Sequence, residues 1–316
     1  MQKMKPEEFK ERLNGPIVVL FTPFKPGDFE VDYEAIRQNL RYLIKAGIKN
    51  VVTTGSGGEF SSLTDEERME IWKTVVEEGK GKVTIIAGNG HSSTKKTIEL
   101  TQYAEKIGID GFMTITPYYL DPDDEGLYQH YKKVAESTSL GIMLYNSPKY
   151  AKTNISLSVL DRLAQIPNIV AIKETAYDMY QFYYMARAME KHNKPAICGM
   201  GEHWYSWCGL IDNCPGFISI LGNWGPDIAL EMHEAVQRRD VLAVGKVRRK
   251  LDPFRTMFIR IQQTRHHSRL AVTKEPMDMI EGLKGGLLRP PLTPLSDEER
   301  AELREIVKGM GKKLKA

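Results

Sequence analysis

The chain has 316 residues, of which 41% are hydrophobic and 27% charged, and its net charge is +3. This is the composition of a globular protein with a large core, and so small a charge gives no reason to expect a nucleic-acid partner. No stretch approaches the ~18 consecutive apolar residues of a membrane-spanning helix, and the polar segment 1–15 does not resemble a secretory signal. The three cysteines are few and odd in number, which argues against a disulfide framework. We therefore expect a cytoplasmic protein without membrane contact.

Short apolar runs rich in Val and Ile recur along the first 240 residues at intervals of about 30 residues. Such continuous runs are typical of parallel strands that are covered on both faces. They lie at 15–24, 50–58, 82–88, 111–119, 140–148, 168–175, 195–201 and 216–223.

A longer amphipathic segment follows each of these runs. The first covers 32–47 and ends at Gly47, a common helix stop. The second opens at Thr64, and Glu67 has the spacing that closes a capping box. Further helical segments are predicted over 93–108, 124–137, 156–165, 178–191, 202–212 and 226–238.

The alternation of strand and helix predicts an α/β fold, a (β/α)8 TIM barrel. A doubly wound open sheet is the alternative, which is less favoured because no G-x-G-x-x-G follows the first strand. After residue 240 no strand pattern returns, and Ser296 with Glu299 opens a last helix through a second capping box. We therefore predict a catalytic barrel over 1–240 and a C-terminal helical appendage over 241–316.

The carboxyl ends of barrel strands are where catalytic side chains stand, and the sixth predicted strand ends in a lysine. Alternation places Ala171 and Lys173 on one face of this strand, and Val170 and Ile172 on the other. An inward lysine in an apolar barrel loses its charge easily, and the neutral amine attacks carbonyl carbons. The alternative is a lysine paired with a nearby carboxylate.

Three further strand ends carry polar or flexible residues. Tyr145 ends the fifth strand and has a hydroxyl suited to proton transfer, or simply packs with that hydroxyl satisfied. The fourth strand ends in Tyr118 and Tyr119, for which aromatic packing is the alternative. The Gly-rich segment 55–59 exposes backbone N–H groups that can hold a carboxylate, although such loops are also ordinary barrel architecture.

Together these pieces resemble the dihydrodipicolinate synthase / N-acetylneuraminate lyase family of class I aldolases. The similarity covers nearly the whole chain, and the order and spacing of its marks are more specific than any one of them. The marks are Thr22-Pro23-Phe24, Ser56-Gly57-Gly58-Glu59, Leu63-Thr64, Glu66-Glu67-Arg68, Pro117-Tyr118-Tyr119, Tyr145-Asn146-Ser147-Pro148, Ile172-Lys173-Glu174-Thr175 and Arg289-Pro290-Pro291-Leu292.

The resemblance implies an enzyme that binds pyruvate or another 2-oxo acid as a Schiff base on Lys173. It implies that Tyr145 is the general acid and base, and that Ser56 relays protons to it. Tyr119 matches a tyrosine that reaches in from a neighbouring subunit, within a homotetramer built from tight dimers. The resemblance implies no metal and no organic cofactor.

Two departures from the family pattern bear on the substrate. Backbone N–H groups of Ser56 and Gly57 are expected to hold the substrate carboxylate, but Gly57 replaces a second hydroxyl residue, so a contact is lost or the pocket is larger. Tyr150 stands where the synthase branch has an arginine for its second substrate, and Lys149 is the adjacent cation. We therefore predict a lyase that cleaves, condenses or dehydrates a 2-oxo sugar acid, with dihydrodipicolinate synthase activity as the alternative.

Several residues near strand ends are candidates for binding the far end of the substrate. Their aromatic members can instead serve rim packing or subunit contacts. Glu202 lies at a predicted helix start, where its carboxylate can simply interact favourably with the helix dipole. The candidates are Lys149, Tyr150, Tyr177, Glu202, His203, Trp204, Ile218, Asn223 and Trp224.

Two other classes of function are weighed against this one. A metal-dependent aldolase is disfavoured because the seven histidines show no ligand spacing at strand ends with carboxylates. A non-enzymatic sensor of 2-oxo acids is disfavoured by the presence of Lys173, Tyr145 and the Ser56 hydroxyl. The segment 246–269 is rich in Lys and Arg, and we expect a solvated or interface face there rather than a nucleic-acid site.

Overall fold

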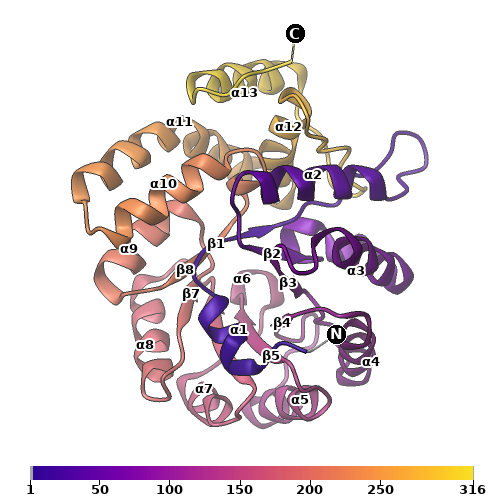
Figure 1. Ribbon diagram of the computed structural model, residues 1–316, viewed down its shortest axis with the longest axis vertical. Helices are drawn as coiled ribbons and strands as arrows, with labels where there is room; N and C mark the ends of the chain where they lie inside the picture. Colours follow the sequence, from indigo (N-terminus) through magenta and orange to yellow (C-terminus); the bar gives the residue numbers. More distant parts are fainter. Residues whose placement is uncertain (1–2, 316) are drawn as a thin grey trace.

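The computed structural model describes residues 3–315, except the side chain of His267. Its eight parallel strands close into a barrel in chain order, with β8 hydrogen-bonded back to β1. The predicted TIM barrel is therefore confirmed, and the open doubly wound sheet was wrong (Figure 1). The strands are β1 (Gly15–Val19), β2 (Asn50–Thr53), β3 (Thr84–Ala87), β4 (Gly111–Ile115), β5 (Gly141–Asn146), β6 (Ile169–Glu174), β7 (Ala196–Cys198) and β8 (Gly216–Ser219).

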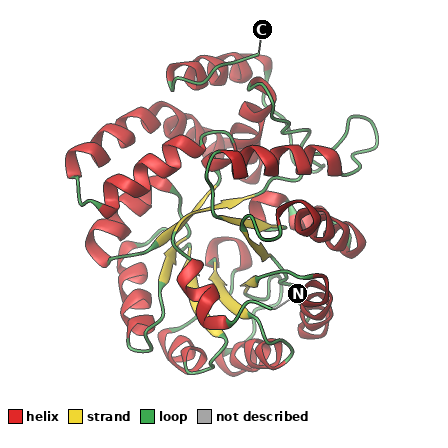
Figure 2. Cartoon of the chain, viewed as in Figure 1, coloured by secondary structure: helices red, strands yellow, loops and turns green. Residues whose placement is uncertain are grey.

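Helices surround the strands on the outside of the barrel, as Figure 2 shows in red around yellow. The predicted capping box is present, because Thr64 accepts from the Glu67 backbone while the Glu67 side chain accepts from the Thr64 backbone. The helices up to residue 237 are α1 (Pro6–Arg12), α2 (Tyr33–Lys45), α3 (Asp65–Gly79), α4 (Thr94–Ile107), α5 (Asp124–Glu136), α6 (Pro148–Ala151), α7 (Leu157–Ala164), α8 (Met179–Glu190), α9 (Glu202–Asp212) and α10 (Pro226–Gln237). Short 3-10 helices follow β2 and β8, namely η1 (Ser56–Gly58), η2 (Phe60–Ser62) and η3 (Leu221–Asn223).

The strands divide the apolar residues into an inner cluster inside the barrel and an outer cluster under the helices. Ala171 belongs to the inner cluster and Ile172 to the outer one, as alternation predicts. The prediction for Val170 was wrong, because it joins Ala171 in the inner cluster. The physical reason is a register irregularity against β5, which sets Ile142 opposite Ile169 but Met143 opposite Ala171.

Helix α1, which the sequence did not reveal, lies across the ring of strands in Figure 1. Its Phe9 is fully buried in the inner cluster. A Cβ atom at Gly111 would lie 2.5 Å from the Phe9 ring, so only glycine fits at this start of β4. The aromatic ring therefore fills the amino-terminal mouth of the barrel, which leaves the carboxyl ends of the strands as the end where a site can open.

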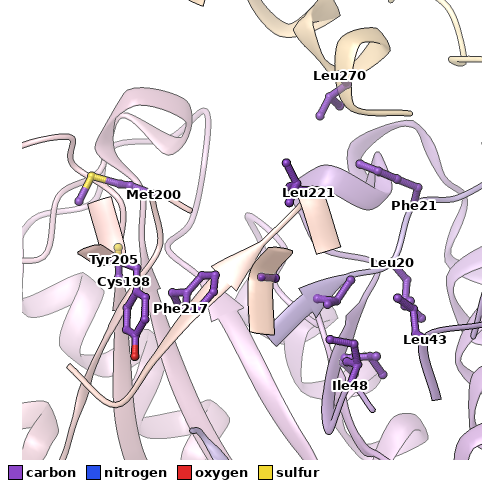
Figure 3. Close-up of a cluster of buried hydrophobic side chains, with 14 of the residues drawn as sticks. Leu20, Phe21, Leu43, Ile48, Cys198, Met200, Tyr205, Phe217, Leu221 and Leu270 are labelled. Atoms are coloured by element: carbon purple, nitrogen blue, oxygen red, sulfur yellow. The ribbon is translucent and has the colours of Figure 1, made fainter. Parts of the chain in front are cut away.

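The C-terminal helices are α11 (Val241–Arg265), η4 (His266–Arg269), α12 (Leu270–Met279) and α13 (Asp297–Gly309). Figure 3 shows Leu270 of this region among the same buried side chains as Leu221 and Phe21 of the barrel. These helices thus pack directly on the barrel, and a domain boundary at residue 240 stays a prediction. No helix within residues 3–315 combines the length and apolarity needed to cross a membrane.

Candidate active site

Two neighbouring strands bring a lysine and a tyrosine into contact. Tyr145 on β5 and Lys173 on β6 are register partners, and both side chains are buried. The Lys173 Nζ atom lies 3.4 Å from the centre of the Tyr145 ring. The amine and the phenol are therefore held against each other inside the barrel, as the alternation of β6 predicts.

Burial and mutual contact set the protonation of this pair. Burial lowers the pKa of Lys173 because the interior disfavours the ammonium, and nearby Tyr145 and Cys198 oppose this effect only in part. Burial alone would raise the pKa of Tyr145, but the charge of Lys173 and hydrogen bonds lower it. No carboxylate of the described residues acts on the Lys173 pKa, which rules against the alternative of a structural ion pair.

The loop after β2 carries the next functional group. Ser56 Oγ and the Tyr145 hydroxyl share a hydrogen bond of 3.4 Å, which links the loop to the tyrosine. Ser56 and Gly57 open η1, so their backbone N–H groups have no acceptor within that helix and remain available for an anion. A Cβ at Gly57 would lie 3.1 Å from Val19 and 3.4 Å from Ile220. The space of a second hydroxyl side chain is therefore filled, and the glycine does not enlarge the pocket.

Three contacts with other segments fix this loop from behind. Thr22 Oγ donates to the Gly58 carbonyl at 2.7 Å. Glu59, which is buried in a left-handed conformation at the end of η1, forms an ion pair of 2.7 Å with Lys274 of α12. The backbone N–H of Arg289 donates to the second Glu59 oxygen at 3.1 Å. The C-terminal region thus holds the loop that presents Ser56.

A cavity of about 270 Å³ opens above the tyrosine at the carboxyl ends of the strands. Lys173 does not line it, but the Lys173 amine lies against the Tyr145 ring, which does. Apolar lining residues include Met200, Leu221 and Leu270, which Figure 3 shows on separate elements. The lining also includes Ser56, Gly57, Tyr145, Tyr150, Thr175, Tyr177, Glu202, His203, Trp204, Ile218, Ile220, Arg255, Phe258, Gln262 and Arg269.

This geometry was compared with known proteins. The family model described as "Dihydrodipicolinate synthetase family" matches residues 12–310. The chain belongs to this family. It is 34% identical over 301 residues to the 4-hydroxy-tetrahydrodipicolinate synthase of Desulforamulus reducens, covering 93% of this chain and 96% of that protein. The corresponding protein of Methanothrix thermoacetophila is 33% identical over 297 residues, with 94% and 96% coverage.

Solved structures of the dihydrodipicolinate synthetase family agree over the whole fold. The dihydrodipicolinate synthase of Aquifex aeolicus gives a TM-score of 0.87 at 28% identity and covers 96% of this chain and 100% of its own. That of Oceanobacillus iheyensis gives 0.88 at 27% identity, with 97% and 99% coverage. The chain is therefore a class I lyase of this family, and these names favour the synthase over the lyase of 2-oxo sugar acids that the sequence favoured.

Most of the predicted family residues lie in the cavity wall. Glu202 at the start of α9 accepts a hydrogen bond from Ser219, and burial raises the pKa of its carboxyl, which favours the neutral acid. Tyr177 and Trp204 meet edge to face on the same wall, with ring centres 6.3 Å apart. Tyr150 also lines the cavity, and its hydroxyl accepts a hydrogen bond from Arg269.

Besides Lys173, which lies behind the Tyr145 ring, four predicted positions lie outside the cavity. Lys149 does not line the cavity, and its Nζ atom lies 5.4 Å from the centre of the Tyr177 ring. Asn223 turns to the barrel and donates to the Val19 carbonyl at 2.8 Å, while Trp224 is buried in the outer cluster. Tyr119 is 88% exposed, so within one chain it does not reach Tyr145. The loops after β4, β5 and β8 turn these side chains away, which strand spacing alone does not reveal.

The sequence reasoning missed the contribution of the C-terminal helices. One face of α11 lines the cavity through Leu251, Phe254, Arg255, Phe258 and Gln262, whose spacing of three or four residues was the available signal. The expectation that 246–269 is only a solvated or interface face is wrong for this stripe. It holds for Arg249 and Arg260, which are exposed.

Proposed function

We propose that this enzyme forms a Schiff base between Lys173 and pyruvate or a related 2-oxo acid, and uses it to form or break a carbon–carbon bond. The observation that carries the proposal is a buried lysine without a carboxylate partner, in contact with Tyr145, under an open cavity. Because burial lowers the pKa of Lys173, its amine is neutral at a lower pH than the ~10.4 of a free lysine.

We assign one group of the cavity to each step of this chemistry. The neutral amine attacks the 2-oxo carbon, and the resulting carbinolamine loses water to give the imine. Tyr145 carries the protons of this step, and its hydrogen bond with Ser56 supplies the relay. The imine draws electrons from the adjacent carbon. In condensation this carbon loses a proton and attacks the carbonyl carbon of an aldehyde. In the reverse direction the bond between the two carbons breaks and the aldehyde is released. The N–H groups of Ser56 and Gly57 hold the carboxylate.

Borohydride reduction in the presence of pyruvate tests the Schiff base. We expect one reduced pyruvate adduct per chain, which peptide mass spectrometry places on Lys173, and no adduct in Lys173→Ala. Binding of pyruvate without any adduct would show that the Schiff-base mechanism is wrong.

The names of the relatives favour 4-hydroxy-tetrahydrodipicolinate synthesis, with pyruvate as one substrate, as the reaction of this chain. Cleavage of a 2-oxo sugar acid is the second candidate, which Tyr150 favours because it occupies the position of the synthase arginine.

A turnover screen separates these two reactions. We expect kcat/KM for the condensation of pyruvate with its best aldehyde to exceed that for cleavage of 2-oxo sugar acids or sialic acid by about 10-fold or more, a difference of about 1.4 kcal/mol. The opposite order would assign the enzyme to sugar acids.

We further propose that the working enzyme is a homotetramer built from tight dimers. The exposure of Tyr119 and its neighbour Leu120, at 88% and 65%, supports a contact with a second copy at this loop. In that arrangement the Tyr119 hydroxyl of one subunit extends the relay of Tyr145 and Ser56 in another.

A further inference from the structure

Among the described residues, the side of the cavity where the synthase branch has its arginine carries no cation that is left for a substrate. Tyr150 occupies that position, and its hydroxyl is bound by Arg269 of η4. The Arg269 guanidinium also lies over the Tyr150 ring, 5.0 Å from its centre. Lys149 lies outside the cavity, so the adjacent cation does not replace the arginine.

A different arginine lines the cavity from the C-terminal region. Arg255 projects from α11 between Phe254 and Phe258, which line the same wall. Within residues 3–315 no hydrogen bond or ion pair is formed by its guanidinium, and the exposed carboxylate of Asp252 acts on it only through its charge. A half-buried guanidinium is costly unless an anion pairs with it.

The other groups around Arg255 leave its charge available. Glu202 and Tyr177 lie within electrostatic reach, but burial raises the pKa of both and favours their neutral forms. Arg248, the other nearby cation, donates hydrogen bonds to the His203 carbonyl and to the Ser206 hydroxyl. Five N–H donors in a planar fork, facing an apolar cavity, form a receptor for a carboxylate.

We propose that Arg255 binds a second carboxylate at the end of the substrate remote from Lys173, so that the enzyme selects 2-oxo acids, or aldehyde partners of pyruvate, that carry a distal acid group. This inference rests on the proposed Schiff base for the orientation of the substrate. The specificity of the site is thereby set by helix α11, outside the eight βα units, rather than by the loop after β5.

Paired 2-oxo acids of equal chain length test the proposal. Half-saturating concentrations for borohydride trapping are measured for 2-oxoglutarate and 2-oxoadipate, and for their uncharged counterparts 2-oxopentanoate and 2-oxohexanoate. We expect the wild-type enzyme to prefer at least one diacid by about 10-fold or more, the range of a hydrogen bond to a charged group. Arg255→Gln is expected to abolish this preference by raising the half-saturating concentration of the diacid to that of its uncharged counterpart.

Two matched variants locate the effect. Arg255→Lys keeps the charge without the fork and is expected to restore part of the preference, whereas Arg249→Gln removes a charge from the exposed face of the same helix and is expected to change nothing. A preference that survives in Arg255→Gln, or that is absent from the wild type, overturns the proposal. Calorimetric binding of the same acids needs no reduction and decides the role of Arg255 even if no imine is trapped, an outcome that would refute only the Schiff base.

Discussion

Turnover is expected to slow by about 10²-fold or more when Tyr145 is replaced by phenylalanine, the usual contribution of a positioned acid–base group. The substitution removes the hydroxyl that Ser56 contacts and keeps the ring against which Lys173 packs. Formation and loss of the carbinolamine then lack their proton carrier. The measurement is kcat for the condensation of pyruvate with its best aldehyde, together with the rate of imine trapping.

The pH profile gives this prediction a second readout. While Lys173, or the protonated imine formed on it, is positively charged, the Tyr145 pKa lies below its ordinary value of about 10, so the phenolate forms, and proton removal accelerates, at a lower pH than for a free tyrosine. The phenylalanine variant is expected to lose this rise of kcat with pH. Tyr131→Phe is the control, because Tyr131 is equally buried but its hydroxyl donates to the Thr114 carbonyl outside the cavity. Equal kcat in wild type and Tyr145→Phe would remove Tyr145 from the mechanism.

Lys274→Met is expected to lower the free energy of unfolding by about 3–5 kcal/mol, the cost of leaving a buried charge without its partner. The Lys274 and Glu59 side chains are only 1% and 2% exposed, and Lys274 also donates to the Leu287 carbonyl at 2.5 Å. Chemical denaturation followed by circular dichroism measures the change. Because Glu59 ends the loop that presents Ser56, we also expect KM for pyruvate to rise.

Two comparisons isolate the buried charge as the cause. Combining Glu59→Gln with Lys274→Met removes both charges and keeps an acceptor for the Arg289 N–H, so at least half of the lost stability should return. Lys308→Met breaks a pair with Glu305 that is 69% and 73% exposed, and should change stability by less than about 1 kcal/mol. A loss that is the same in the single and the double variant would mean that packing, not charge, is responsible.

The contact between Lys173 and Tyr145 was predictable because strand geometry is local. Alternation along 168–175 points Lys173 inward once β6 is recognised, and a barrel in chain order makes β5 its neighbour, which brings Tyr145 alongside. The Val170 prediction failed because a register irregularity arises from the pairing of two strands and leaves no mark on one strand alone.

The structure explains by direct contacts why the family motifs near the two ends of the chain belong together. The Phe24 ring lies under Lys274 and Arg289, at 4.8 and 4.2 Å. Arg289 also forms hydrogen bonds of 2.8 and 2.7 Å with both oxygens of Glu67 at the start of α3. These residues are far apart in sequence, so their common role in holding the Gly-rich loop was not visible from the motifs.

By itself the sequence determined the barrel, the family and the inward lysine, because these depend on local periodicity and on motifs within single strand ends. Only the tertiary structure decided which side chains meet across the cavity. It turned Tyr119, Lys149 and Asn223 away, and it brought the C-terminal helices over the cavity, so that Arg269 holds Tyr150 and Arg255 lines the cavity. The physical reason is that loop paths and the docking of α11 depend on long-range packing, on which the spacing of residues along one chain segment carries no information.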